Sequence, residues 1–104
     1  MQSLTKRNDF DVLFATGTRR RSGDLTVVRA PVGAGSMTKV AVIAGKRVGN
    51  AVQRNRAKRR VREALRRVGL PTGEHIAVMA GPRTGTADFP VLVEWVRGGL
   101  HADA

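Results

Sequence analysis

The stretch between Gly49 and Gly69 constrains the fold more than any other part of the chain. It contains neither glycine nor proline, and its small and aliphatic residues recur at the spacing of an α-helix. These residues are Ala57, Val61, Ala64, Leu65 and Val68. Asn50 is a favourable N-cap, and Gly69 and Pro71 end the pattern. The sequence therefore predicts a helix over 51–68 that packs on a sheet through one narrow stripe.

The predicted helix is strongly basic. Eight of the 14 residues from Arg54 to Arg67 are Arg or Lys, and Glu63 is the only acidic one. Solvated helices commonly combine charges of both signs at i, i+4 spacing. A surplus of one sign instead favours a polyanionic partner. Opposite the apolar stripe lie Asn55, Arg59, Arg62 and Arg66, and its flanks carry Arg54, Lys58 and Arg60.

The whole chain has a formal charge of +11 in 104 residues. Such a surplus costs self-repulsion in a compact domain, and nucleic acid relieves that repulsion while binding releases condensed counterions. An anionic membrane would also attract the charge, but a narrow stripe of mostly Ala and Val suits a sheet better than a bilayer. No apolar run approaches the ~20 residues of a membrane span. We therefore expect no membrane partner.

The remaining segments predict a mixed fold. Asn8 is expected to cap a short first helix, on which Phe10 and Phe14 share an apolar face. Phe14 is expected to pack into the core, whereas for Phe10 both core packing and exposure stay open. The later elements are an edge strand near residues 19–21, strands at 25–31 and 38–45 with 40–44 buried on both faces, a strand centred on 76–79, and a last helix ending at Gly98 and Gly99. This order predicts an α/β (α+β) two-layer sandwich, in a single domain of residues 1–104.

The sequence offers no catalytic constellation. It has no Cys and no Tyr, and His75 and His101 are its only imidazoles. Such a set supplies no nucleophilic triad, acid–base pair or two-histidine metal site. The glycine-containing segments do not match a phosphate-binding loop. We therefore predict no catalytic and no metal-ligating residue, and the lack of Cys fits a reducing cytoplasm.

A longer pattern surrounds the start of the basic helix. The segment KRVGNAVQRNRAKRRVRE closely resembles the signature of the protein subunit of bacterial ribonuclease P. The matching residues are Lys46, Arg47, Gly49, Asn50, Ala51, Arg54, Asn55, Arg56, Lys58, Arg59, Arg62 and Glu63. The first helix with its paired Phe residues and the strand HIAVMAGP fit the same family, so the resemblance extends over nearly the whole chain. An ordered match of this length is far more specific than a basic run.

The resemblance implies a function. Ribonuclease P cuts the 5′ leader from precursor tRNA, and its RNA subunit carries the active site and the catalytic Mg²⁺. The protein subunit, without a cofactor of its own, would bind the RNA subunit and precursor tRNA, and would otherwise be monomeric and cytoplasmic. A left-handed strand–helix–strand crossover around the basic helix is also implied. The residues implied at the RNA subunit are Arg54, Asn55, Arg56, Lys58, Arg59, Arg62 and Arg66, and those at the leader cleft are Phe10, Phe14, Lys46 and Arg47.

Two other interpretations stay open from the sequence. A basic ribosomal or general RNA-binding protein would share the charge without a role in cleavage. A self-sufficient nuclease is disfavoured because catalytic residues are missing. The chain also departs from the family at Ile43–Gly45, where the family commonly alternates hydroxyls, and at Gly81, where Arg is common. These departures leave the polar side of the leader cleft open.

Overall fold

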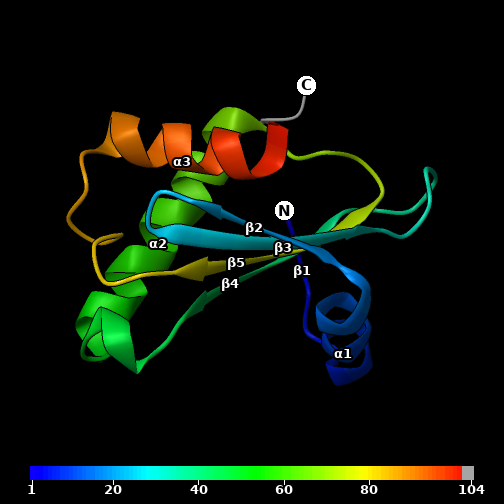
Figure 1. The fold of residues 1–104 in the computed structure, drawn as a ribbon, viewed down its shortest axis with the longest axis horizontal. Coiled ribbons are helices and arrows are strands. Elements are labelled where there is room, and N and C mark those ends of the chain that lie inside the picture. The colour runs from blue at the N-terminus through cyan, green and yellow to red at the C-terminus, as the bar shows by residue number, and fades with distance from the viewer. Residues whose placement is uncertain (102–104) are drawn as a thin grey trace.

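The computed structural model describes residues 1–101. After a short first strand that the sequence did not predict, its elements follow the predicted order of helix, strands, long helix, strand and helix (Figure 1). They are β1 (Gln2–Ser3), α1 (Arg7–Thr16), β2 (Thr18–Ser22), β3 (Leu25–Pro31), β4 (Lys39–Ala44), the single 3₁₀ turn η1 (Lys46–Val48), α2 (Ala51–Val68), β5 (Glu74–Ala80) and α3 (Phe89–His101). The predicted bounds of the basic helix are confirmed. The edge strand expected near residues 19–21 is β2.

The strands form one five-stranded sheet in the order β1-β4-β5-β3-β2. β1, β4 and β5 run parallel, whereas β3 is antiparallel to both β5 and β2. α2 connects the neighbouring parallel strands β4 and β5. Together with α3 it covers one face of the sheet, and α1 lies on the opposite face (Figure 1). The sheet with α2 and α3 is the predicted sandwich, to which α1 adds a partial layer.

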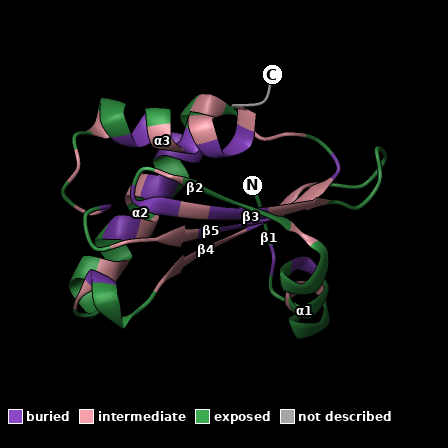
Figure 2. Ribbon diagram, in the orientation of Figure 1, coloured by how far each residue is buried: buried purple, intermediate pink, exposed green. Residues whose placement is uncertain are grey.

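Successive strand residues point to opposite faces of the sheet and so contribute to two apolar clusters. Val27 and Val78 point toward α2 and α3 and form the larger cluster with residues such as Val61. Val28 and Ala77 point the other way and meet Leu13 of α1. The buried surfaces of α2 and α3 therefore face the sheet, while their outer surfaces are open (Figure 2).

β4 is less buried than its sequence predicts. Val40 is buried, but residues 41–44 are only half-buried, so the expectation of burial on both faces is wrong for most of the strand. The reason is the short β1, which pairs only Gln2 with Lys39 and Ser3 with Val40. Beyond Val40, β4 has a neighbouring strand on one side alone among residues 1–101.

The start of α2 follows its sequence signal, whereas the start of α1 does not. The Asn50 side chain accepts the Gln53 N–H at 2.9 Å, and the Gln53 side chain accepts the Asn50 N–H at 2.8 Å, which forms a capping box. α1 begins at Arg7 with Lys6 as its N-cap and no side-chain cap bond. The predicted cap Asn8 is therefore wrong, because Asn8 lies inside the helix.

The two glycines near the end of α3 do not end it. The helix continues through Gly98 and Gly99 to His101. A Cβ on Gly99 would lie 2.5 Å from the Val27 side chain, and one on Gly98 would lie 2.7 Å from the Ser22 hydroxyl. These glycines let α3 approach β2 and β3 closely, so the predicted stop signal is instead a packing requirement.

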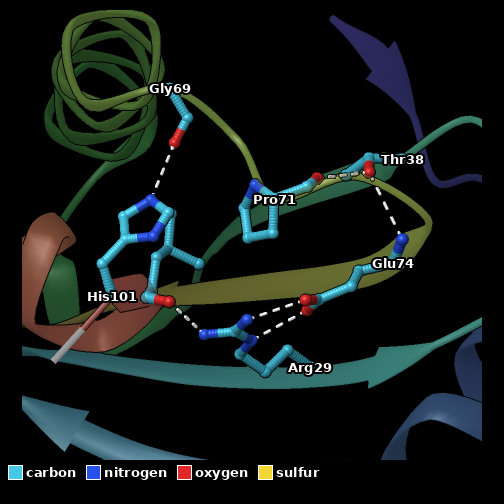
Figure 3. A network of polar contacts seen from close by, with 7 residues as sticks. Arg29, Thr38, Gly69, Pro71, Glu74 and His101 are labelled. Atoms are coloured by element: carbon cyan, nitrogen blue, oxygen red, sulfur yellow. Dashed lines mark hydrogen bonds and ion pairs between the residues drawn. The ribbon is translucent and has the colours of Figure 1, made fainter. Parts of the chain in front are cut away.

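A polar network ties the end of α3 to the sheet and to the end of α2 (Figure 3). Arg29 of β3 donates to both carboxylate oxygens of Glu74 on β5, at 2.8 and 2.7 Å. The same guanidinium donates to the carbonyl oxygen of Leu100. The His101 Nε2 donates to the carbonyl of Gly69 over 3.2 Å. Arg29 thus serves the fold, although it belongs to the basic surplus.

Candidate nucleic-acid interface

The outer side of α2 carries the ridge that was predicted to bind RNA. The inner side, with Val61 and Leu65, is fully buried. The residues turned outward are Asn55, Arg59, Arg62 and Arg66, all of them exposed. Val52, which is 67 % exposed, joins Asn55, Arg59 and Arg62 in lining a shallow hollow of about 410 Å³. The structure therefore confirms which side of the helix is apolar and which is open.

The other three residues predicted on this helix lie on its flanks. Arg54 and Lys58 are half-buried. Arg56 is exposed and lines a small hollow with Pro82 and Thr86, from the loop that follows β5. The basic residues therefore surround more than half of the helix circumference.

Most of these cations have no partner among the residues that the structure describes. Within residues 1–101, no ion pair and no side-chain hydrogen bond is made by Arg54, Arg56, Lys58, Arg59 or Arg62. Arg66 donates to Glu63 at 2.7 Å, but both side chains are more than half exposed. Exposed pairs of this kind contribute about 0–1 kcal/mol, so Arg66 can exchange Glu63 for a phosphate at little cost. The ridge is a set of cations available to an anionic ligand.

Two other arginines of α2 hold the fold instead. Arg60 donates to the carbonyl of Thr84 at 2.8 Å and also to the carbonyl of Ala87. The Arg67 guanidinium lies 5.7 Å from the centre of the Phe89 ring, in cation–π contact. Both residues face the loop and helix that follow β5. The basic segment of the sequence is therefore divided between structural and available groups.

The aromatic pair of α1 is oriented differently from the sequence expectation. The Phe10 and Phe14 rings stack with centroids 6.3 Å apart and an angle of 11° between their planes. Phe10 is half-buried against the smaller apolar cluster, whereas Phe14 is 37 % exposed. The Arg19 guanidinium of β2 lies 5.9 Å from the centre of the Phe14 ring. The expected core packing of Phe14 is wrong, since this ring lies at the rim of the sheet.

Lys46 and Arg47 lie at the other end of the sheet, where β4 ends, and both are exposed in η1. Arg47 lines a hollow of about 380 Å³ together with Arg21 and Arg83. The four predicted cleft residues thus form two groups, an aromatic pair on α1 and a basic pair after β4. Sequence reasoning did not assign Arg21 to this surface. The signal was available, because alternate residues of an edge strand share a face.

A groove of about 470 Å³ extends from α1 to α2 across the edge of β4. Phe10 contributes to its lining from α1, and Ile43 from β4. Arg62 and Arg66 line it from α2. Residues that the sequence assigned to two separate RNA contacts therefore meet at one groove.

Among residues 1–101, no group of three or more His, Asp or Glu side chains is placed to hold a metal ion. In the same part of the chain, no helix is long and apolar enough to cross a membrane.

The fold and the exposed basic ridge define a small α+β domain with a surface suited to a polyanion such as RNA. The family model described as Ribonuclease P matches residues 1–102. The ribonuclease P protein component of Dehalococcoides mccartyi is 39 % identical, with 80 % of this chain and 68 % of that protein covered. That of Ruegeria pomeroyi is 36 % identical, with 94 % and 82 % covered. The RNase P protein from Thermotoga maritima superposes with a TM-score of 0.82 at 26 % identity, covering 98 % of this chain and 97 % of that one.

The chain belongs to the ribonuclease P protein family. It is a protein component of the ribonucleoprotein enzyme that processes tRNA, and it partners ribonuclease P RNA. The predicted α+β fold is confirmed, since the Thermotoga maritima protein shares it over almost its full length. Membership of this family also sets aside the alternatives of a ribosomal protein and of a self-sufficient nuclease.

Proposed function

We propose that α2 binds the RNA subunit of ribonuclease P and that the α1 side of the sheet binds the 5′ leader of precursor tRNA. The row of cations on α2 without partners in residues 1–101 carries this proposal. Each guanidinium or ammonium group held on a rigid helix can neutralise a phosphate and release its counterion. The protein acts as one domain, is monomeric apart from RNA and works in the cytoplasm.

The contacts to the RNA subunit come from the outer side and the flanks of α2. The residues are Arg54, Asn55, Arg56, Lys58, Arg59, Arg62 and Arg66. Side chains three and four residues apart on a helix lie about 5–6 Å from each other at Cβ, so the ridge offers a regular series of donors. The Asn55 amide adds both a donor and an acceptor.

The leader contacts come from the two groups on the sheet. The exposed Phe14 ring and the half-buried Phe10 can stack an unpaired base without reading its identity. Lys46 and Arg47 can neutralise phosphates in leaders of many sequences. Hydrolysis and its Mg²⁺ belong to the RNA subunit, while the protein positions the leader and supports the folded RNA.

Reconstitution tests the function. The protein is combined with its cognate RNA subunit and precursor tRNA at low Mg²⁺. Accurate 5′ cleavage that needs both components supports the proposal. Binding without rescue of cleavage would point to a general RNA-binding role, and cleavage by protein freed of all RNA would overturn the assignment of chemistry to the RNA subunit.

The leader site has its own test. Phe14→Ala and Lys46→Ala should each weaken precursor tRNA binding by the holoenzyme and leave mature tRNA binding nearly unchanged. Loss of one stacked base should reduce the binding free energy of precursor tRNA by about 1–3 kcal/mol. Val12→Ala, at an exposed position of the same helix as Phe14, is the control. A precursor preference that survives both substitutions would show that the leader lies elsewhere.

A further inference from the structure

β4 has a free edge after Val40, and the polar groups along this edge belong to the backbone and not to the side chains. Residues 41–44 are Ala, Val, Ile and Ala, which offer no hydrogen-bonding side chain. β1 ends after pairing Ser3 with Val40, and β5 pairs with the other side of β4. An unpaired strand edge presents N–H and C=O groups in a row. The groove lined by Phe10, Arg62 and Arg66 lies at this edge.

The direction of the free groups follows from one hydrogen bond. The Leu4 N–H donates to the Val40 carbonyl at 2.9 Å, so the Val40 backbone groups point toward β1. Backbone groups alternate between the two sides of a strand, as in any ladder. Val42 and Ala44 therefore point the same way as Val40, while Ala41 and Ile43 point toward β5. Within residues 1–101, no strand lies beside Val42 and Ala44 on that side.

We propose that this edge binds a nucleotide of single-stranded RNA, with the backbone groups of Val42 and Ala44 as its hydrogen-bonding partners. Phe10 supplies an apolar wall on one side of the groove, and Arg62 and Arg66 supply phosphate contacts on the other. The inference rests on the proposed leader binding and extends it across β4 to α2. It gives Arg66, which is also among the residues proposed at the RNA subunit, a contact to the single strand.

The charge of the groove favours RNA over a protein strand. An extended peptide could also pair with β4, and so could a second copy of this chain. A second copy, however, would bring together two chains that each carry +11. Unpaired bases expose donors and acceptors on their edges, which suit backbone N–H and C=O groups, and their phosphates suit arginines. A volume of about 470 Å³ lies within the ~300–1,000 Å³ of small-ligand pockets, enough for one nucleotide.

Backbone amides report this binding directly. The ¹⁵N-labelled chain is titrated with a short single-stranded oligoribonucleotide, and amide shifts and hydrogen exchange are followed by NMR. The Val42 and Ala44 amides should shift with saturation and exchange more slowly. The Ala41 and Ile43 amides, already bonded toward β5, should change less. Saturable RNA binding that leaves Val42 and Ala44 unchanged would overturn the edge site alone, and absence of any binding would overturn the leader proposal as well.

The same titration separates the alternative occupants. If the Val42 and Ala44 amides shift with protein concentration in the absence of RNA, a second copy occupies the edge and the RNA assignment fails. If they shift only when RNA is added, the occupant is RNA.

Arg66 and Arg97 form a matched pair for a second measurement. Both are exposed, and each pairs with a glutamate three residues earlier on its own helix. Arg66 lines the β4 groove, whereas Arg97 lies on α3, outside the proposed RNA contacts. Arg66→Ala should reduce the slope of log K against log[salt] for the oligoribonucleotide by about 0.7, the value for one single-strand phosphate contact. Arg97→Ala should leave that slope unchanged. Equal slopes for both variants would overturn the assignment of Arg66.

Discussion

Both flanks of α2 carry arginines, but the arginines on one flank stabilise the fold and those elsewhere are available to a ligand. On one flank, Arg60 binds two backbone carbonyls and Arg67 packs over Phe89. On the outer side and the opposite flank, Arg59 and Arg62 touch no partner within residues 1–101. The difference depends on what lies beside each arginine, since the loop after β5 and α3 cover only one flank. A run of arginines in a sequence therefore overstates the number that can bind RNA.

The largest effect should come from introducing a carboxylate on the buried side of α2, compared with one on its exposed side. Val61→Asp buries a carboxylate in the core and should remove most of the ~5–15 kcal/mol that stabilises a domain of this kind. Val52→Asp places the same group at a position 67 % exposed, and it should keep the fold while weakening RNA-subunit binding. Thermal unfolding followed by circular dichroism gives the stability of both variants, and filter binding gives the RNA-subunit affinity of Val52→Asp. Equal melting temperatures would show that the helix faces are misassigned.

Salt should weaken RNA-subunit binding strongly. If about six basic side chains contact phosphates, log K against log[salt] should fall with a slope near −4 to −5, at ~0.7–0.9 per contact. Replacing Arg59 and Arg62 together with Ala should make the slope shallower by about 1.4–1.8, with little change in stability. Filter binding over a range of salt concentrations gives the slopes. A wild-type slope shallower than about −2 would mean that the ridge is mostly solvated.

Arg60→Ala should give the opposite result to Arg59→Ala. It leaves the carbonyls of Thr84 and Ala87 without their donor, and hydrogen bonds to charged groups contribute about 1.5–3 kcal/mol each. We expect a loss of roughly 3 kcal/mol, the low end for two such bonds, in the free energy of unfolding measured with urea. Arg59→Ala should change it by less than about 0.5 kcal/mol. If the two variants are equally stable, the contrast between the flanks is lost.

Glu63→Gln should have the smallest effect. It removes the single carboxylate of α2 and frees Arg66, so the affinity for the RNA subunit should rise slightly. Stability should fall by no more than about 1 kcal/mol, because the pair is largely exposed. Parallel urea and RNA-binding measurements test both statements. A drop in RNA affinity would indicate that Glu63 positions Arg66 for its ligand.

Local and periodic signals determined much of this protein from sequence. The apolar stripe, the Asn50 cap and the glycine after Val68 defined α2, because helix formation depends on neighbours within a few residues. The motif from Lys46 to Glu63 pointed to the family, which the comparisons then established. These features needed no knowledge of the distant chain.

The tertiary structure decided everything that depends on which distant segments meet. Arg60 is structural because a loop 24 residues further along the chain brings its carbonyls to it. Gly98 and Gly99 are packing residues because β2 and β3 approach α3 there, and Phe14 is exposed because α1 covers only part of its face of the sheet. The free edge of β4 exists because β1 is two residues long. Each outcome follows from contacts between elements, which the spacing of residues along one element does not encode.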